Sequence, residues 1–419
     1  MLTVVEGLVL AGGACVMGYC LMLCLASLVA WSRSREAPLI WPRHVFAVLI
    51  PAHNTESTIG QTIERFLQRI QYPRDLFDLI VIPVRCLDRT AAIARQKGAI
   101  VYERGHGAWT DRDDAIQSTI ERLLAKRRHD AFIILETTVE VSPNFLGVMS
   151  DKLSKGAKVI QAGYRVTGPF PSWAASVAAG VRAVSIYLCP LLSHRPGLSL
   201  GLQRVGVCLA RSVVEKYGVR TPSVTDGLAY AARLLLDHVL VTFAPKAVVS
   251  ETAPPDPAPA DRPVSQRVIA RCHLIRDYTL PLLWSGVRGR SAAQMSGAIN
   301  TLIPPFPWLF SGTLVLLILS TLAHRLTPHP YSARLVIGWE CMIAGQMVMA
   351  VSGFVRGRVP ALVYLTLPSI PLYLLWQAYR SWTGGWNHAP DEVVSQGRVF
   401  SAARGALPGR RVMNRHNVR

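Results

Sequence analysis

The distribution of apolar residues begins with a long uncharged run. Residues Gly7 to Trp31 carry no charged side chain, and this run of about 25 residues exceeds the roughly 20 that a helix needs to cross a bilayer core. Arg33 and Arg35 follow directly. By the positive-inside rule they hold that end in the cytoplasm and place the N-terminus outside. We therefore predict a retained N-terminal transmembrane anchor over residues 1–36.

From residue 44 to about residue 250, short apolar segments alternate with amphipathic ones. Five segments rich in β-branched residues predict strands, at residues 45–51, 78–84, 99–103, 130–136 and 158–166. Three amphipathic segments between them predict helices, at residues 57–70, 89–98 and 113–128. This alternation is typical of a mainly parallel sheet with helices on both faces, so we predict an α/β fold.

The last third of the chain predicts a membrane region. A Pro-rich stretch at residues 252–263 predicts a linker, and the amphipathic segment 264–284 predicts an interfacial helix. Apolar segments at residues 303–322 and 335–355 predict two further spans. A third segment, 359–376, contains three prolines, and we expect it to be re-entrant or interfacial, because a third crossing would put the basic tail outside.

We therefore expect four regions. They are the anchor at 1–36, a cytoplasmic domain at 44–290 that ends in the interfacial helix, a membrane region at 291–380 and a basic tail at 381–419. Gln346 lies near the middle of one predicted span, and we expect it to hydrogen-bond to another span of this chain or to a partner protein. Glu340 lies near the outer end of the same span.

The net charge of the chain indicates which kinds of partner to expect. The formal net charge is +19, which on a membrane protein indicates contact with anionic lipid. The basic residues are scattered and no nucleic-acid motif accompanies them, so we predict no nucleic-acid partner. The sequence has 8 cysteines but no CxxC pair and no Cys/His cluster with metal-ligand spacing.

Candidate chemistry starts at the first predicted strand. The segment VLIPAHNTESTIGQTI resembles the opening of a family 2 glycosyltransferase, where a strand ends in a Pro-Ala-His-Asn loop that leads into a helix. Four later segments match in the same order, beginning at Asp75, Asp130, Gly197 and Ser223. The resemblance covers residues 45–275. It implies a glycosyltransferase-A-like, Rossmann-like domain with the membrane layout of cellulose and hyaluronan synthases, in a bacterial-type inner membrane with the main domain cytoplasmic.

The resemblance also implies where the chemistry should lie, and several of those positions hold other residues. Val84 stands at the nucleobase-contacting Asp, Thr138 at the metal-binding Asp, and Gly227 at the general-base Asp. In the Gln-x-x-Arg-Trp motif Gln266 is kept, but Ile269 and Ala270 replace the Arg and Trp. We therefore expect no bound metal and no cofactor.

The residues that remain at the implied nucleotide-sugar site form one set: His53, Asn54, Glu56, Asp88, Glu136, Thr138 and Gln266. Asp88 is also suited to be the N-cap of a helix that starts at Arg89. Glu136 and Glu140 offer carboxylate oxygens near the metal position, but are otherwise a strand-end and a solvated carboxylate. Asp226 can act as the base only if the backbone shifts by one residue, and it is equally suited to capping a helix.

Three hypotheses stay open. The first is a catalytically degenerate protein that scaffolds or regulates a membrane complex, with another integral membrane protein as partner. The second is an active inverting enzyme that uses Glu136, Glu140 and Asp226 to transfer sugar from a nucleotide-diphosphate donor to a lipid or envelope polysaccharide. The third is a membrane binding protein unconnected with sugars. We place the first ahead, because losses at four separate parts of the site accompany an intact set of core strands.

Overall fold

The computed structural model describes residues 11–18 except 16, 43–103, 112–188 except 169 and 171, 202, 205–219, 227–252 and 264–384. Most of the predicted anchor, Asp226 and the tail at 385–419 lie outside these residues. The strands are β1 (Phe46–Ala52), β2 (Phe77–Pro83), β3 (Ile100–Val101), β4 (Ala131–Ile134), β5 (Val139–Val141), β6 (Val159–Thr167), β7 (Val207–Ala210) and β8 (Val241–Thr252).

The helices of the sheet domain lie between these strands. They are α2 (Ile59–Arg69), α3 (Thr90–Gln96), α4 (Arg112–Ala125), α5 (Phe145–Ser154), α6 (Trp173–Leu188), α7 (Arg211–Tyr217) and α8 (Gly227–Leu236), with a 3₁₀ turn at Arg74–Leu76. The C-terminal helices are α9 (Val264–Leu274), a π-helical turn η3 (Ile275–Thr279), α10 (Leu280–Arg288), α11 (Ala292–Leu302), α12 (Phe306–Leu326), α13 (Pro330–Gly357), α14 (Ala361–Tyr364), η4 (Leu367–Ser369) and α15 (Ile370–Gly384).

One eight-stranded sheet organises the domain, in the order β3-β2-β1-β4-β7-β6-β8-β5. The pairs β1–β2, β1–β4, β2–β3 and β6–β8 are parallel, while β4–β7, β6–β7 and β5–β8 are antiparallel. Apolar side chains that alternate along β1 build two cores. Val48 and Ile50 pack with α2 and α5 on one face, while Ala47 and Leu49 pack with α4, α7 and α8 on the other. The α/β prediction is confirmed.

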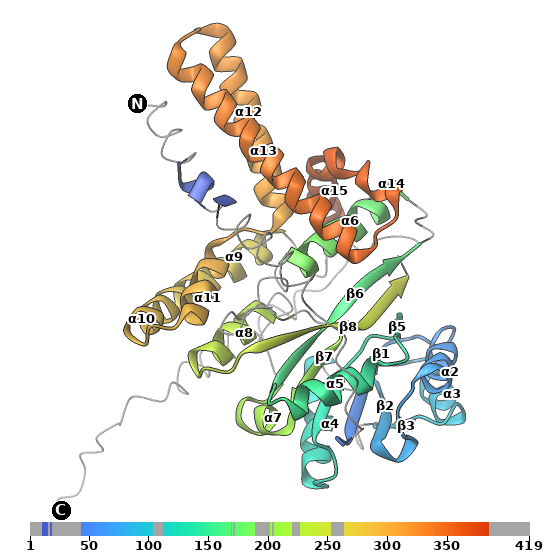
Figure 1. Cartoon of the computed structure of the whole chain (residues 1–419). Coiled ribbons are helices and arrows are strands. Elements are labelled where there is room, and N and C mark those ends of the chain that lie inside the picture. The colour runs from blue at the N-terminus through green and yellow to red at the C-terminus, as the bar shows by residue number, and fades with distance from the viewer. Residues whose placement is uncertain are drawn as a thin grey trace, which may run out of the picture.

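Helices α12 and α13 form a long hairpin that stands away from the sheet domain (Figure 1). Within the described residues, α12 and the Pro330–Val355 part of α13 are the helices long and apolar enough to cross a membrane. The predicted third segment is broken into α14, η4 and the 15-residue α15. Its re-entrant placement stays a prediction.

The hairpin is joined to the sheet domain mainly through α6. Gly180 and Gly353 permit this close packing: a Cβ at Gly180 would come within 3.2 Å of the Phe354 ring in α13, and one at Gly353 within 3.3 Å of the Cα atom of Val184. Near the N-terminus, a Cβ at Gly13 would approach Met342 to 2.8 Å, so that segment contacts α13. The base of the hairpin therefore rests on the sheet domain rather than on a linker.

Candidate functional site

The candidate site lies where β1, β2 and β4 end. These strands are parallel neighbours, so their carboxyl ends meet at one edge of the sheet, which is where α/β proteins bind ligands. The loop after β1 carries His53, Asn54 and Glu56, and the loop after β2 carries Asp88. The prediction that His53 and Asn54 follow the C-terminal end of a strand is confirmed, because β1 ends at Ala52.

These two loops are hydrogen-bonded to each other. Nδ1 of His53 lies 2.7 Å from the carbonyl oxygen of Val84, and the amide of Leu87 donates to Oδ1 of Asn54 at 2.9 Å. Asn54 has a left-handed backbone, with φ of 46°, a conformation that Asn tolerates better than most residues. The His53 and Asn54 side chains, which were expected to contact a nucleotide, therefore bind the loop after β1 to the loop after β2. We call this network, over residues 53–56 and 84–90, the two-loop clasp.

Glu56 and Asp88 complete the two-loop clasp. The amide of Glu56 donates to Oδ2 of Asp88 at 3.0 Å, and the amide of Arg89 donates to Oε2 of Glu56 at 3.0 Å. Oδ1 of Asp88 accepts from the amide and the hydroxyl of Thr90. The Thr90 hydrogen bond holds the pKa of Asp88 below its usual value. Helix α3 begins at Thr90 rather than Arg89, so Asp88 precedes the N-cap by one residue yet still caps the helix through Thr90.

The position of the nucleobase contact is apolar and enclosed. Val84 is buried, its amide donates to the Ala52 carbonyl at 2.7 Å, and its own carbonyl faces His53. A buried valine offers a base neither a donor nor an acceptor from its side chain. The side chain of residue 84 therefore cannot form the hydrogen bond to a nucleobase that the family implies at this position.

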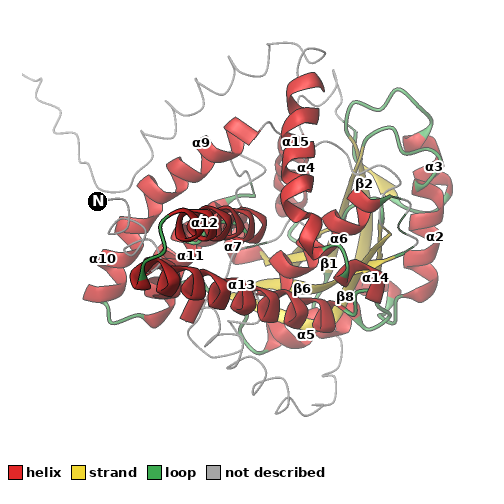
Figure 2. Ribbon diagram, turned by 90° about the horizontal axis from the view of Figure 1, so that it is seen from above, coloured by secondary structure: helices red, strands yellow, loops and turns green. Residues whose placement is uncertain are grey.

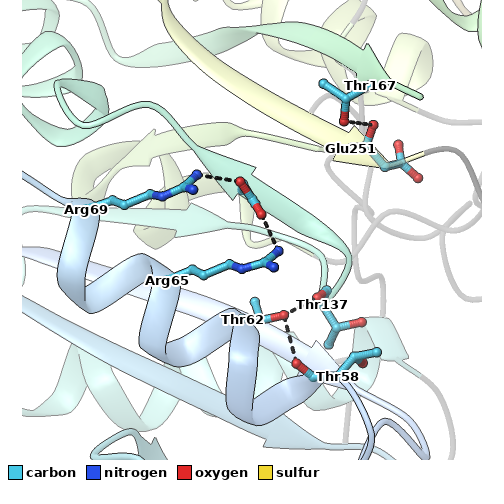
Figure 3. Close-up of polar contacts among 8 residues, drawn as sticks. Thr58, Thr62, Arg65, Arg69, Thr137, Thr167 and Glu251 are labelled. Atoms are coloured by element: carbon cyan, nitrogen blue, oxygen red, sulfur yellow. Dashed lines mark hydrogen bonds and ion pairs between the residues drawn. The ribbon is translucent and has the colours of Figure 1, made fainter. Parts of the chain in front are cut away.

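The turn between β4 and β5 is where the family implies a metal ion. Thr138 lies in this turn, and the neighbouring carbonyl of Thr137 accepts a hydrogen bond from the hydroxyl of Thr62 at 2.7 Å (Figure 3). One and two turns further along α2, Arg65 and Arg69 both bind Glu140, the second at 2.6 Å. Both carboxylate oxygens of Glu140 are therefore paired with guanidinium groups.

The second nearby carboxylate is also paired with a cation. Nη1 of Arg112, at the start of α4, lies 3.4 Å from Oε1 of Glu136. Within the described part of the chain, no group of three or more His, Cys, Asp and Glu residues is placed to hold a metal ion. Oxygen ligands for a divalent cation must be available carboxylates or carbonyls. A threonine flanked by two arginine-paired glutamates does not fit the metal that the family implies.

The position of the general base is closed by the backbone. Gly227 begins α8, and a Cβ placed on it would overlap the carbonyl oxygen of Leu202 and lie 2.8 Å from the carbonyl carbon. The amide of Leu202 also donates to the Gly227 carbonyl at 3.2 Å. Residue 227 therefore has no space for a carboxylate in this structure, whereas Asp226 lies outside the described residues.

Helix α9, which the family implies as the diphosphate-binding helix, makes a different set of contacts. Ile269, at the position of the family's Arg, is exposed, and Gln266 lies in α9 with its side chain outside the described atoms. Nη2 of Arg271 donates to the carbonyls of Ile303 and Asn300, at the C-terminal end of α11. Arg271 therefore caps α11, where unpaired carbonyls attract a cation.

Sequence reasoning missed one polar cluster beside the site. Glu251 is buried at the end of β8, opposite Val139 of β5, and its Oε2 accepts from the hydroxyl of Tyr164 and from Nη1 of Arg182, the latter at 2.5 Å. Burial raises the pKa of Tyr164 well above its usual range, so the phenol keeps its proton and donates it. Arg182 belongs to α6, so this cluster ties the sheet to the helix that carries the hairpin. The signal in the sequence was a glutamate, Glu251, at the end of the largely apolar strand segment VTFAPKAVVSE.

Comparison with known proteins identifies the family to which the sheet domain belongs. The model of the family described as glycosyltransferase like family 2 matches residues 42–265, more than half of the chain. No curated protein matches. The domain is thus of the glycosyltransferase class. The chain belongs to the glycosyltransferase-like family 2, and the resemblance drawn from its sequence is confirmed.

Several solved structures are similar at low identity. The mannosyltransferase PcManGT of Pyrobaculum calidifontis, solved with GDP-Man and Mn²⁺, is 13% identical over 84% of this chain and 99% of its own, with a TM-score of 0.49. S. aureus TarS 1–349, solved with UDP-GlcNAc, is 13% identical over 81% and 92%, with a TM-score of 0.39. Glucosyl-3-phosphoglycerate synthase of Mycobacterium tuberculosis is 19% identical over 57% and 79%, with a TM-score of 0.34.

Proposed function

We propose that this chain is a membrane-anchored member of the family that scaffolds or regulates a membrane complex handling envelope glycans, and that it does not carry out metal-dependent sugar transfer. The observation that carries the proposal is the state of the metal position. Thr138 replaces the ligand, while the nearby Glu140 and Glu136 are engaged by Arg65, Arg69 and Arg112. A metal ion would have to displace guanidinium groups from both carboxylates.

Two further features support the same proposal. The two-loop clasp uses the side chains that would otherwise face a nucleotide, and breaking it to admit a ligand would leave hydrogen-bonding groups unpaired. Residue 227 cannot present a base without a backbone shift. The domain thus keeps its sheet and both cores, while the positions for base contact, metal binding and the general base lack the residues that the family implies.

Binding of nucleotide and metal is the direct test. Calorimetric titration of the full-length protein in detergent with Mn²⁺ and UDP, and again with GDP, is expected to give no binding tighter than about 1 mM, because Val84 cannot contact the base and Thr138 cannot replace the metal-binding carboxylate. A matched variant, Thr138→Asp with Arg65→Ala and Arg69→Ala, restores one carboxylate and frees Glu140. It is expected to bind Mn²⁺ more tightly than the parent.

The opposite result identifies the rival function. Micromolar, metal-dependent binding of UDP or GDP by the unaltered protein would overturn the proposal. It would favour an active inverting glycosyltransferase that takes sugar from a nucleotide-diphosphate donor and uses Glu136, Glu140 and Asp226.

The proposal includes placement in a bacterial-type inner membrane with the sheet domain cytoplasmic. The two apolar helices of the hairpin support it, as do Arg33 and Arg35 after the N-terminal apolar run. Helices α9 and α10 run beside the base of the hairpin, where α12 is seen end-on (Figure 2). A helix in that place would lie along a bilayer surface.

The exposed face of α10 supports the same placement. Leu280, Leu283, Trp284 and Val287 follow helical spacing on one side of α10 and are all exposed, Trp284 by 71%. Arg288 lies in the last turn of the same helix. Apolar residues on one face, a tryptophan and adjacent arginines are typical of a helix lying at the surface of an anionic bilayer.

We expect α10 to insert its apolar face into lipid. In a cysteine-free background, an NBD label at Trp284→Cys should shift its emission to shorter wavelength when the full-length protein is placed in vesicles containing phosphatidylglycerol. The same label at Glu121→Cys, an exposed residue of α4, should not shift. Equal emission from the two positions would contradict an interfacial α10.

A further inference from the structure

One carboxylate lies on an apolar helix face that the described chain leaves uncovered. Glu340 is exposed in the first half of α13, as the eleventh of its 28 residues. The exposed apolar residues on the same side of the helix are Ile337, Val348, Val351 and Val355. No hydrogen bond or ion pair joins Glu340 to another residue within the part of the chain that the structure describes.

The depth of Glu340 makes this exposure costly. Arg334 lies six residues earlier in the helix, which at 1.5 Å per residue places the Glu340 backbone about 9 Å further along the axis. If Arg334 marks the outer membrane surface, Glu340 lies within the hydrocarbon region. Ionisable groups at such depth are expensive and pair with a partner or face a polar cavity.

Among the described residues, three neighbours of α13 lie on other sides of the helix. They contact Met342 from the N-terminal segment, Gln346 from α12 and Gly353 from α6. At 100° per residue these three positions are about 160°, 120° and 140° away from Glu340 around the helix axis. The N-terminal segment that touches Met342 therefore approaches α13 on nearly the opposite side.

Gln346, for which the sequence left open another span or a partner protein, is bonded inside the chain through its amide nitrogen, while its Oε1 has no hydrogen-bond partner within the described residues. Its Nε2 donates to the hydroxyl of Thr313 in α12 at 2.8 Å, and that hydroxyl donates to the Leu309 carbonyl at 2.8 Å. Gln346 is fully buried. Of the two alternatives predicted for Gln346, the structure therefore has the contact with another span. Glu340, in contrast, is exposed and has no hydrogen bond or ion pair within the described residues.

We propose that the Glu340 face of α13 binds a transmembrane helix of another protein that carries a Lys or Arg at the matching depth. This inference deepens the proposed scaffold role and rests on it. A second copy of the chain is disfavoured, because a twofold axis along the membrane normal would bring Glu340 against Glu340. Lipid is disfavoured as well, because acyl chains offer no donor to a carboxylate.

A crosslinking experiment in native membranes tests the proposal. The photoreactive residue benzoylphenylalanine at Val348 of the full-length protein should give an adduct with a second, different membrane protein. Glu340→Lys should lower the yield of that adduct at least tenfold, and Glu340→Gln, which keeps the shape, should lower it severalfold. Gln346→Leu, on the same helix but paired within the chain, is the matched control and should leave the yield unchanged.

Charge reversal in the captured protein completes the test. Replacing its Lys or Arg with Glu should restore the adduct in the Glu340→Lys variant. An adduct of twice the mass of the chain, no protein adduct from Val348, or a yield that Glu340→Gln leaves unchanged would each overturn the inference. Nucleotide titration stays separate: micromolar nucleotide binding would remove the proposed loss of catalysis while leaving a charge-dependent adduct at Glu340 intact.

Discussion

Replacing Gly227 with aspartate is expected to destabilise the sheet domain rather than restore a catalytic base. A side chain at residue 227 would overlap the carbonyl of Leu202, and the hydrogen bond from the Leu202 amide holds these two backbone segments together. Overpacking against side chains costs about 1–3 kcal/mol. Here the obstacle is backbone, so we expect a loss of about 3 kcal/mol or more in the free energy of unfolding. Thermal unfolding of the full-length protein in detergent measures it.

A glycine with open surroundings gives the control. Nothing lies within 4 Å of a Cβ built on Gly312, inside helix α12. Gly312→Ala should therefore be neutral or stabilise by up to about 1 kcal/mol through helix propensity. A Gly227→Asp protein with an unchanged unfolding midpoint would contradict the steric account. Gain of sugar transfer by that variant would contradict the proposed function as well.

Arg182→Met is expected to weaken the junction between the sheet and α6. Within the described residues, the variant leaves the buried carboxylate of Glu251 with the Tyr164 hydroxyl as its one remaining partner. Removing one partner of a buried ion pair costs roughly 3–5 kcal/mol. Because the Arg182 side chain is half exposed, water can reach the cluster, and we expect the lower end, about 3 kcal/mol.

The double variant Arg182→Met/Glu251→Gln separates charge from packing. It removes both charges while keeping the volume of the glutamate side chain, so most of the lost stability should return. Urea unfolding followed by tryptophan fluorescence would give the three free energies of unfolding. Equal losses in the single and double variants would show that Arg182 acts through packing of its stem alone.

The fold was largely predictable because strand and helix periods are local. The predicted strands at 45–51, 78–84 and 130–136 overlap β1, β2 and β4, and helix α2 lies inside its predicted range. The four-residue β7 and three-residue β5 were missed, because so few residues show no clear period. Both pair antiparallel, which is why the parallel character predicted for the sheet holds on one side more than on the other.

The site was predictable in position but not in bonding. Strand ends place His53, Asn54, Glu56 and Asp88 together, and the structure has them there. Their hydrogen bonds reach across more than 30 residues of sequence to backbone atoms of the opposite loop, and no periodicity reports such contacts. Whether these residues or Glu136, Thr138 and Gln266 ever meet a ligand stays a prediction.

The apolar hairpin of α12 and α13 shows the same limit. The sequence placed polar residues in an apolar helix but could not say which side of the helix each would face. Gln346 is turned toward Thr313, whereas Glu340 is turned away from every described neighbour. The rotation of one packed helix relative to another depends on the shapes of all the side chains between them. This arrangement cannot be predicted from the spacing of apolar residues in one sequence.

The length of α13 has a mechanical consequence. Its 28 residues extend about 42 Å, whereas a bilayer core is about 30 Å thick. If the hairpin crosses the membrane, α13 must either tilt or leave about two turns outside the hydrocarbon core, shared between its two ends. One rigid rod would then connect the external loop to the sheet domain. A change in bilayer thickness or in the tilt of the rod would then move the sheet domain, which contacts α13 at Gly353 through α6, relative to the membrane surface.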